Sequence, residues 1–344
     1  MPEPGLSYRD AGVDIDAAHR AMRGVAELVR STATPDTLSE LGSFGGLYRI
    51  PGDVRRPVLV ASTDGVGTKL KIAFLSGRHG TVGEDLVNHC VNDILVQGAR
   101  PLFFLDYVGV GRLEPGTVES IVEGVARGCR ANGCALLGGE TAEMPDFYAA
   151  GEYDIAGTIV GVVEEERVID GSAIRPGDAL VALGSSGLHT NGYSLARRVV
   201  FERMGLSVDD PFPGEEASVA EVLLRVHRSY LASLRPLIER GEVRGMAHIT
   251  GGGLVDNVPR VLPEGVDARF ERGSWEVPNV FRVLQREGGV EEGEMFRAFN
   301  MGVGMVVVVA GDSADGVVRE LRAAGEEAWI AGEIAPGGRT VLLS

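Results

Sequence analysis

The sequence is poor in cysteine, and its few cysteines form no pattern that a disulfide framework or a zinc site requires. Its 344 residues include three cysteines, Cys90, Cys129 and Cys134. Cys129 and Cys134 have no second pair of ligands to complete a zinc site, and an odd, sparse set does not support a disulfide network. We therefore expect reduced thiols and a cytoplasmic protein.

Long apolar segments are missing too, and basic residues are outnumbered by acidic ones. The best apolar run, Val303–Ala310, has the length of a strand, whereas a membrane-spanning helix needs about 20 residues. Met1–Tyr8 has neither the basic nor the apolar region of a signal peptide. The 33 Lys and Arg against 49 Asp and Glu give a net charge of −16, which disfavours nucleic-acid and membrane-surface binding. A small phosphate ligand stays compatible, because backbone N–H groups and a metal ion can hold it.

Several catalytic motifs are also absent. The sequence contains no Gly-x-Ser-x-Gly elbow, no His-Glu-x-x-His, no Cys-x-x-Cys and no Gly-x-Gly-x-x-Gly loop after a strand. Covalent nucleophilic catalysis and zinc-dependent hydrolysis therefore have no recognisable motif in this chain.

Strand and helix patterns alternate over two halves, and 44% hydrophobic residues suffice for substantial cores. A turn-rich segment, Asp170–Asp178, separates the halves, and we expect α/β domains over residues 1–168 and 169–344. Apolar spacing predicts strands at 57–62, 102–108, 135–137, 153–163, 179–183, 246–249, 303–309 and 328–334. It predicts helices at 81–97, 117–132, 193–204, 217–240, 254–261 and 314–324.

Glycine is abundant, with 49 residues, and it clusters where an apolar run ends and a helical pattern begins. Glycine at such turns lets the backbone approach a ligand closely. In the strongest cluster, Ser62–Lys69, Asp64 is a candidate Mg²⁺ ligand and Lys69 a candidate for neutralising phosphate charge. Gly65 and Gly67 would expose backbone N–H groups, although the spacing is not that of a Walker A loop. The alternative is an ordinary β-turn that caps a helix.

The predicted helix 81–97 carries a stripe of amides, carboxylates and an imidazole. Residues four apart share a helix face, so these side chains can converge in pairs. No Lys or Arg occurs from Val82 to Ala99, which favours a ligand site over a merely solvated face. The stripe consists of Asp85, Asn88, His89, Asn92 and Asp93.

Four more glycine-rich segments lie beside predicted strands. In Gly138–Pro145, Glu140 is either a second Mg²⁺ ligand or part of a capping box. The others, at 184–192, 248–253 and 299–304, offer hydroxyl, amide and backbone groups that suit a sugar phosphate. Their candidate contacts are Ser185, Ser186, His189, Asn191, His248, Gly251, Gly252 and Asn300. By itself, His189 is either a substrate-contacting imidazole or a plain loop histidine.

These segments, in their order along the chain, resemble phosphoribosylformylglycinamidine cyclo-ligases from Ser7 almost to the C-terminus. The opening Tyr-x-Asp-Ala-Gly-Val-Asp-Ile together with Gly-Gly-Glu-Thr-Ala-Glu-Met-Pro is highly specific. The segments that carry the resemblance are Tyr8–Asp16, Asp64–Lys69, Cys90–Gly98, Pro101–Tyr107, Gly138–Pro145, Gly184–Ser194, His248–Gly253 and Phe299–Gly304.

The resemblance implies a two-domain α/β protomer whose N-terminal, ATP-binding domains pair into a homodimer with a shared β-barrel. The C-terminal α/β domain would complete the active-site cleft. The implied substrates are ATP and formylglycinamidine ribonucleotide, with Mg²⁺ as cofactor held by Asp64, Asp93 and Glu140. The implied ATP contacts are Gly45, Gly46, Ser62, Thr63, Asp64, Gly65, Gly67, Thr68, Lys69, Asn92, Asp93, Gly138, Gly139, Glu140 and Thr141.

The implied reaction belongs to purine biosynthesis and forms 5-aminoimidazole ribonucleotide. ATP phosphorylates the formyl oxygen, the amidine nitrogen attacks that carbon, and phosphate leaves. Such phosphoryl transfer needs positioning and charge neutralisation, for which Lys69 is the candidate, and proton transfers, for which His189 and His248 are the candidates.

Two departures from the family pattern stand out. The family commonly reads Pro-Thr-Arg-x-Tyr where this chain has Val226–Tyr230, with Arg228 and Tyr230 retained. His248 replaces an Asp that other superfamily branches use for metal, which predicts fewer Mg²⁺ ligands from the C-terminal half.

Two rival functions remain at this point. One is a kinase or synthetase of the same superfamily with another acceptor, although a selenide enzyme would carry a reactive cysteine earlier than Cys90. The other is a non-catalytic nucleotide-binding oligomer. The chain retains all four candidate residues for phosphate and metal, which argues against this alternative: Asp64, Lys69, Asp93 and Glu140.

Overall fold

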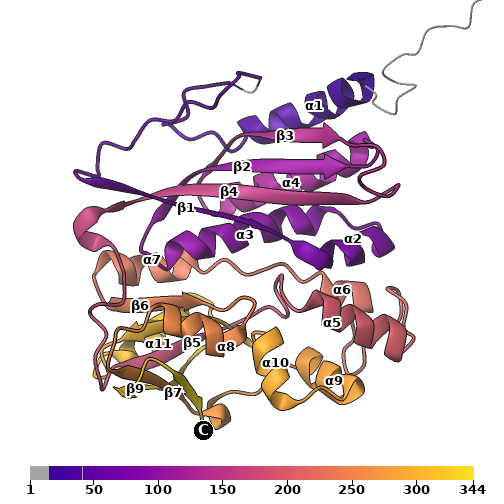
Figure 1. Ribbon diagram of the computed structural model, residues 1–344. Helices are drawn as coiled ribbons and strands as arrows, with labels where there is room; N and C mark the ends of the chain where they lie inside the picture. Colours follow the sequence, from indigo (N-terminus) through magenta and orange to yellow (C-terminus); the bar gives the residue numbers. More distant parts are fainter. Residues whose placement is uncertain (1–14, 41) are drawn as a thin grey trace, which may run out of the picture.

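The structure is a computed structural model that describes residues 15–40 and 42–344 and contains two sheets in succession (Figure 1). Residues 8–14 of the Tyr8–Asp16 motif therefore lie outside the described ranges. Within those ranges, no helix combines the length and apolar character needed to cross a membrane.

The elements before residue 170 are α1 (Ile15–Arg30), β1 (Pro57–Gly65), α2 (Leu70–Ser76), α3 (Gly80–Leu95), β2 (Arg100–Val110), α4 (Pro115–Ala131), β3 (Ala135–Glu143) and β4 (Tyr153–Glu164). Those after it are β5 (Ala179–Gly184), α5 (Tyr193–Arg197), α6 (Val219–Leu223), α7 (Leu231–Glu239), β6 (Val243–His248), α8 (Gly253–Asn257), β7 (Val266–Phe270), α9 (Asn279–Gly288), α10 (Glu292–Ala298), β8 (Val303–Val309), α11 (Ala314–Ala323), β9 (Ala328–Pro336) and β10 (Val341–Leu343).

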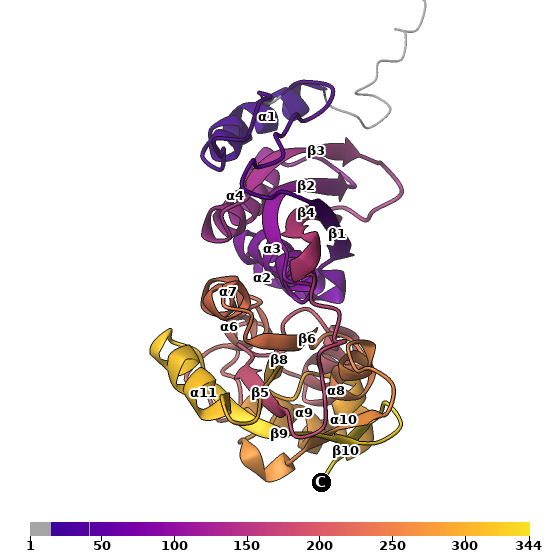
Figure 2. The ribbon, with the colours of Figure 1, turned by 90° about the vertical axis from the view of Figure 1, so that its left-hand side faces the viewer.

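The first sheet has four strands in the order β1-β4-β2-β3. β4 is antiparallel to both β1 and β2, while β2 and β3 are parallel and are joined through α4. A parallel pair needs such a crossover, because the chain must return to the end of the sheet where the first strand began before it enters the second strand. Figure 2 shows α3 and α4 on one face of this sheet, with the second half of the molecule beyond α2 and α3.

The second sheet has six strands in the order β10-β7-β9-β5-β8-β6. Its pairs are antiparallel except for β10 with β7. The interior strand β8 is buried along its whole length, which explains its run of valines. The carboxyl ends of β5 and β6 and the start of the antiparallel β8 meet at one edge, from which the predicted substrate loops emerge.

Helices α3 and α4 cross at backbone contact because two glycines face each other. A Cβ atom added to Gly83 would lie 2.2 Å from the carbonyl oxygen of Ile121, and one added to Gly124 would lie 2.2 Å from that of Gly80. No side chain fits in that space. The crossing holds α3, with its polar stripe, in a fixed position above the first sheet.

Most predicted elements are confirmed, and the failures fall on glycine-rich and capped segments. The predicted helix 217–240 is wrong, because α6 and α7 are separated by a segment without regular secondary structure over 225–230. Residues 138–143, taken as a turn, continue β3, and the predicted helix 193–204 passes from α5 into a π-helical turn over Arg198–Arg203. The pattern gave no prediction for α1, β7, α9, α10 or β10.

The other face of the first sheet carries no helix of the described chain (Figure 2). Its residues alternate with those facing α3, as shown by the hydrogen bond of 2.7 Å between Thr63 Oγ1 and Thr158 Oγ1 across the open face. The open face carries the apolar side chains of Leu59, Phe103, Leu105, Tyr107 and Val160 beside the polar Thr63 and Thr158. Leu59 is 56% exposed, and the Tyr48 ring lies at one margin, 5.4 Å from the Phe103 ring and tilted by 44°. Neither sheet closes into a barrel within the described residues.

Candidate active site

The polar stripe of α3 faces the second half of the molecule and is buried, except for the half-buried Asp93. Asp85 and Asn92 have no exposed surface, and Asn88 and His89 are 6% and 4% exposed. The interpretation of this stripe as a solvated face is therefore wrong. The absence of Lys and Arg along the helix distinguished this stripe in the sequence. It is explained by the contact of the helix with a second layer of protein.

Two candidate Mg²⁺ ligands lie together at the end of β1 and on α3. Asp64 Oδ2 is 2.9 Å from His89 Nε2, and Asp93 Oδ2 is 3.9 Å from the same nitrogen. Ser62 Oγ donates to Asp93 Oδ2 at 2.9 Å, and Asp93 Oδ1 accepts from His248 Nδ1 at 2.8 Å. The structure thus brings the predicted Ser62, Asp64, Asp93 and His248 together across the two halves.

The charges of this group stabilise one another. Burial opposes the ionisation of Asp64, but the hydrogen bond and positive charge of His89 outweigh it and lower the pKa of Asp64. Burial likewise opposes ionisation of Asp93, whose pKa is lowered by its hydrogen bond to His248. For His89, burial is outweighed by Asp64 and Asp93, so the pKa of this imidazole is raised. Both carboxylates are thus held as anions, the form that binds a cation.

Three more imidazoles lie behind His89. The His189 and His227 rings stack at 4.0 Å, and His227 Nε2 is 2.9 Å from His248 Nε2. Thr190 Oγ1 connects the cluster, at 2.7 Å from His89 Nδ1 and 3.3 Å from His227 Nδ1. Burial lowers the pKa of His189, His227 and His248, with the neighbouring positive charges adding to the effect at His189 and His227. These three rings are held in the neutral form.

Lys69 is fully buried and joins the two halves. Its Nζ donates to Asp85 Oδ1 at 2.9 Å, to the carbonyl of His189 at 3.0 Å and to that of Arg225 at 2.7 Å. Burial lowers the pKa of Lys69 and raises the pKa of Asp85, and their mutual attraction opposes both shifts. Three acceptors account for the three N–H bonds of the ammonium group. A direct role of Lys69 at a phosphate stays a prediction.

The predicted substrate-contacting residues of the second half converge at the edge where β5, β6 and β8 meet. Ser185 Oγ donates to Asn300 Oδ1 at 3.0 Å, and Ser186 Oγ donates to the carbonyl of Val226 at 2.5 Å. Asn191 Oδ1 lies 3.3 Å from the position that a Cβ on Gly251 would take, beside Gly252. Asn300 is buried, whereas Ser185, Ser186 and Asn191 are half-buried. Their contact with a substrate stays a prediction.

Among the remaining predicted ATP contacts, those on β3 and at residues 45–46 lie apart from Asp64 and Asp93. Gly138, Gly139, Glu140 and Thr141 line a small cavity of about 60 Å³ on β3. β3 lies three strand spacings from β1, about 14 Å, and Glu140 points to the open face of the sheet. Within one protomer, Glu140 therefore does not join Asp64 and Asp93. Gly45 and Gly46 are exposed, and a Cβ on Gly46 would contact Leu137. Thr68 Oγ1 lies 3.1 Å from Ser194 Oγ, Gly67 is exposed, and Thr63 is exposed on the open face of the sheet, where it bonds to Thr158.

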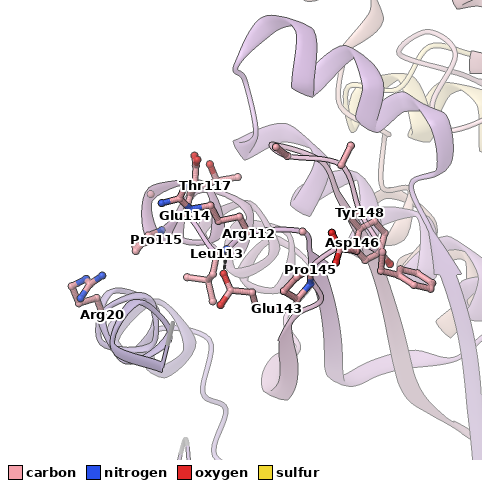
Figure 3. A pocket seen from close by; sticks show the side chains of 15 residues that line it. Arg20, Arg112, Leu113, Glu114, Pro115, Thr117, Glu143, Pro145, Asp146 and Tyr148 are labelled. Atoms are coloured by element: carbon pink, nitrogen blue, oxygen red, sulfur yellow. Dashed lines mark hydrogen bonds between the residues drawn. The ribbon is translucent and has the colours of Figure 1, made fainter. Parts of the chain in front are cut away.

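A larger cavity of about 1470 Å³ opens at the ends of β2 and β3 (Figure 3). Arg112, Glu114, Glu143 and Tyr148 line it, and Arg20 of α1 lies at its far side. Glu143 Oε1 accepts a hydrogen bond of 2.7 Å from the backbone N–H of Leu113. None of the residues predicted to bind ATP, substrate or metal lines this cavity.

Two buried groups of the site were not predicted. His227 stood out only as a departure from the family pattern, and its place in the predicted helix 217–240 gave no reason to put it beside His189 and His248. Asp85 was seen in the stripe, but its pairing with Lys69, 16 residues earlier, has no local periodicity. The one sequence feature that marked His227 was a titratable side chain at a position where the family commonly has an uncharged one.

The comparisons with known proteins agree along the whole chain. Models described as AIR synthase related protein, N-terminal and C-terminal domain, match residues 46–163 and 175–343. The phosphoribosylformylglycinamidine cyclo-ligase of Trichlorobacter lovleyi is 54% identical over 335 residues, 97% of this chain and 96% of that protein. The enzyme of the same name from Alkaliphilus metalliredigens is 48% identical over 344 residues, 100% of this chain and 99% of that protein.

Solved structures show the same fold at low identity. Thiamine-monophosphate kinase from Stenotrophomonas maltophilia is 18% identical with a TM-score of 0.70, covering 93% of this chain and 96% of that one. Hydrogenase maturation protein HypE in complex with ATP is 19% identical with a TM-score of 0.68, covering 95% and 90%. Full-length identity near one half leaves no other family in question: the chain belongs to the phosphoribosylformylglycinamidine cyclo-ligases.

Proposed function

We propose that the chain is a ligase of purine biosynthesis that cyclises formylglycinamidine ribonucleotide to 5-aminoimidazole ribonucleotide with ATP. The observation that carries this proposal is 54% identity to a phosphoribosylformylglycinamidine cyclo-ligase over 97% of the chain. The rival acceptors of the superfamily have only structural likeness at 18–19% identity behind them.

We propose that Asp64 and Asp93 hold Mg²⁺ with the nucleotide. Two anionic carboxylates on either side of His89, with Ser62 Oγ beside them, fit the preference of Mg²⁺ for oxygen ligands. Bound Mg²⁺ neutralises phosphate charge during transfer to the formyl oxygen. Glu140 of the same protomer is too far away to share this ion, so its place in a metal site depends on a second subunit.

Proton transfer during ring closure is assigned to His248 and His189. The Nδ1–H of His248 donates to Asp93, which leaves Nε2 as the basic atom, and burial keeps the ring neutral and able to accept a proton. Lys69, whose three donors are engaged, holds the backbone of His189 in place. If His189→Ala and His248→Ala both leave kcat unchanged, imidazole catalysis is wrong.

We further propose a homodimer in which the apolar open face of the first sheet pairs with its copy, with residues 1–168 forming the dimerising domain and 169–344 the domain that completes the cleft. The exposed Leu59 and the apolar row around it support this arrangement. A cytoplasmic location is part of the proposal, supported by three buried cysteines without disulfide partners.

The test is aminoimidazole formation by the purified chain from ATP and formylglycinamidine ribonucleotide, with ADP release measured with and without the ribonucleotide. We expect ribonucleotide-dependent ADP release, and we expect Asp93→Asn to lower kcat about 100-fold or more. ADP release that ignores the ribonucleotide but responds to thiamine monophosphate would replace this proposal with the sibling kinase.

A further inference from the structure

A strained turn precedes β8, next to the predicted substrate loop. It spans residues 300–303 and is closed by a hydrogen bond of 2.9 Å from the backbone N–H of Val303 to the carbonyl oxygen of Asn300. Both central residues have a positive φ, 51° at Met301 and 96° at Gly302. Glycine adopts such angles readily, but a residue with a bulky side chain such as Met301 rarely does so. The turn therefore requires contacts that hold it in this shape.

The side chain of Asn300 ties this turn to the loop after β5. Asn300 Oδ1 accepts from Ser185 Oγ at 3.0 Å and from the backbone N–H of Gly302 at 2.9 Å. Its Nδ2 donates to the carbonyl of Gly187 at 2.9 Å, and the backbone N–H of Ser185 donates to the carbonyl of Gly302 at 2.9 Å. Asn300 is buried and uses most of its hydrogen-bonding capacity inside the protein. We therefore expect this predicted substrate contact to shape the loop rather than to touch the substrate.

Trp275 holds the other side of the turn. Its indole Nε1–H donates to the carbonyl oxygen of Met301 at 3.0 Å, and no other donor of the described chain engages this carbonyl. Because the carbonyl belongs to the residue with the uncommon φ, this bond fixes the peptide unit between Met301 and Gly302. A Cβ atom on Gly302 would lie 2.5 Å from Pro278 Cδ and 3.8 Å from Trp275 Cδ1, so the turn also packs closely against both residues.

The two tryptophans of the chain, Trp275 and Trp329, form a stacked pair. Their ring centroids are 6.2 Å apart with an interplanar angle of 29°, which restrains the Trp275 ring. The two indole N–H groups differ in their contacts. Trp329 Nε1 is buried and has no hydrogen-bond partner among the described residues, whereas Trp275 Nε1 binds the turn. One of two neighbouring indoles can therefore act on the substrate loop through a hydrogen bond.

We propose that Trp275 is a positioning residue for the ribonucleotide. By holding the carbonyl of Met301, it keeps the turn over 300–303 in shape, and Asn300 transmits that shape to the loop after β5. This inference rests on the proposed function and on the prediction that the loop after β5 contacts the ribonucleotide. The hydrogen bond and the ring contact of Trp275 do not involve the proposed Mg²⁺ ligands, so its effect falls on the ribonucleotide and not on ATP.

The test compares Trp275→Phe with Trp329→Phe in steady-state kinetics of aminoimidazole formation by the full chain. Both substitutions keep an aromatic ring in the stack and remove an indole N–H, but only that of Trp275 has an acceptor. We expect Trp275→Phe to raise the KM for formylglycinamidine ribonucleotide about 10-fold, because the buried carbonyl of Met301 loses its donor. The KM for ATP and kcat should change less than about 2-fold, and Trp329→Phe should match the wild-type chain.

A second measurement uses the wild-type chain, which removes any dependence on the folding of variants. Hydrogen exchange of the Trp275 indole N–H, followed by NMR, should slow when the ribonucleotide binds, because an occupied loop holds the turn closed. Equal KM values in the two variants, a loss in Trp275→Phe that ATP and the ribonucleotide share, or an unchanged exchange rate overturns the inference while the proposed function stands. Absence of aminoimidazole formation by the wild-type chain instead overturns the proposed function, and this inference with it.

Discussion

Lys69 and Asp85 are both fully buried, so the loss of either partner leaves an uncompensated charge in the interior. We expect Asp85→Asn to lower the free energy of unfolding by about 3–5 kcal/mol, measured by urea denaturation. The exposed pair Arg235–Glu239 is the control, and Glu239→Gln should cost less than about 1 kcal/mol. A loss in Asp85→Asn no larger than that of the control contradicts the pairing.

Asp106 offers a prediction on pH at the same scale. Burial raises the pKa of this carboxyl to about 7. Between its ordinary value and pH 7, the folded state binds more protons than the unfolded state, so stability falls as the pH rises through that window. We expect Asp106→Asn to remove this decline, which is at most about 1.4 kcal/mol per pH unit, in unfolding curves taken from pH 4 to 8. An unchanged slope in the variant would refute the shift.

Prediction from sequence worked best for residues at the ends of strands. Asp64 and His248 follow apolar runs, and Asp93 lies on a helix with clear periodicity, so their meeting could be expected. Lys69 was placed at a phosphate because a lysine after a glycine loop has that chemistry. Its engagement with Asp85 and with two carbonyls of the second half depends on how the halves pack, which no local pattern encodes.

Helices α3 and α4 owe their close crossing to Gly83 and Gly124, and this supplies a prediction for an element pair. Gly124→Ala forces the helices apart or distorts them, and we expect a loss of about 1–3 kcal/mol in thermal or urea unfolding. Gly116→Ala in the same helix has no atom within 4 Å of the new methyl group, and it should be neutral or slightly stabilising. Equal effects of the two substitutions would contradict the crossing.

The segment between α6 and α7 shows why the predicted helix 217–240 failed. Its apolar residues fit a helical period, but the backbone over 225–230 finds its hydrogen bonds on α3 instead of within a helix. Asn92 Oδ1 accepts from the N–H of Tyr230, and Asp85 Oδ1 accepts from that of His227. Partners more than 130 residues away in sequence thus override local periodicity, which single-sequence reasoning cannot detect.

For the whole molecule, the open apolar face of the first sheet predicts self-association. Leu59→Asp removes an apolar contact and buries a charge, and we expect the dimer dissociation constant to rise about 100-fold or more in analytical ultracentrifugation. Leu75→Asp on α2 is the control, because Leu75 is 59% exposed but lies away from this face. A monomeric wild-type chain, or equal effects of both substitutions, would refute the dimer.

The alternation of strands and helices predicted two α/β halves, but strand order and the open face follow from packing between distant elements.

Most of the hydrogen bonds between α3 and residues 225–230 use the main chain of that segment. The side chains of Lys69, Asn88 and Asn92 bind the carbonyls of Arg225, His227 and Arg228, while two N–H groups point back to α3. These main-chain hydrogen bonds do not depend on which side chains the segment carries, except that proline at 227 or 230 would remove a backbone N–H donor. The side chains of this segment can therefore be replaced without loss of these hydrogen bonds. This tolerance explains how an imidazole, that of His227, can occupy a position at the centre of the enzyme.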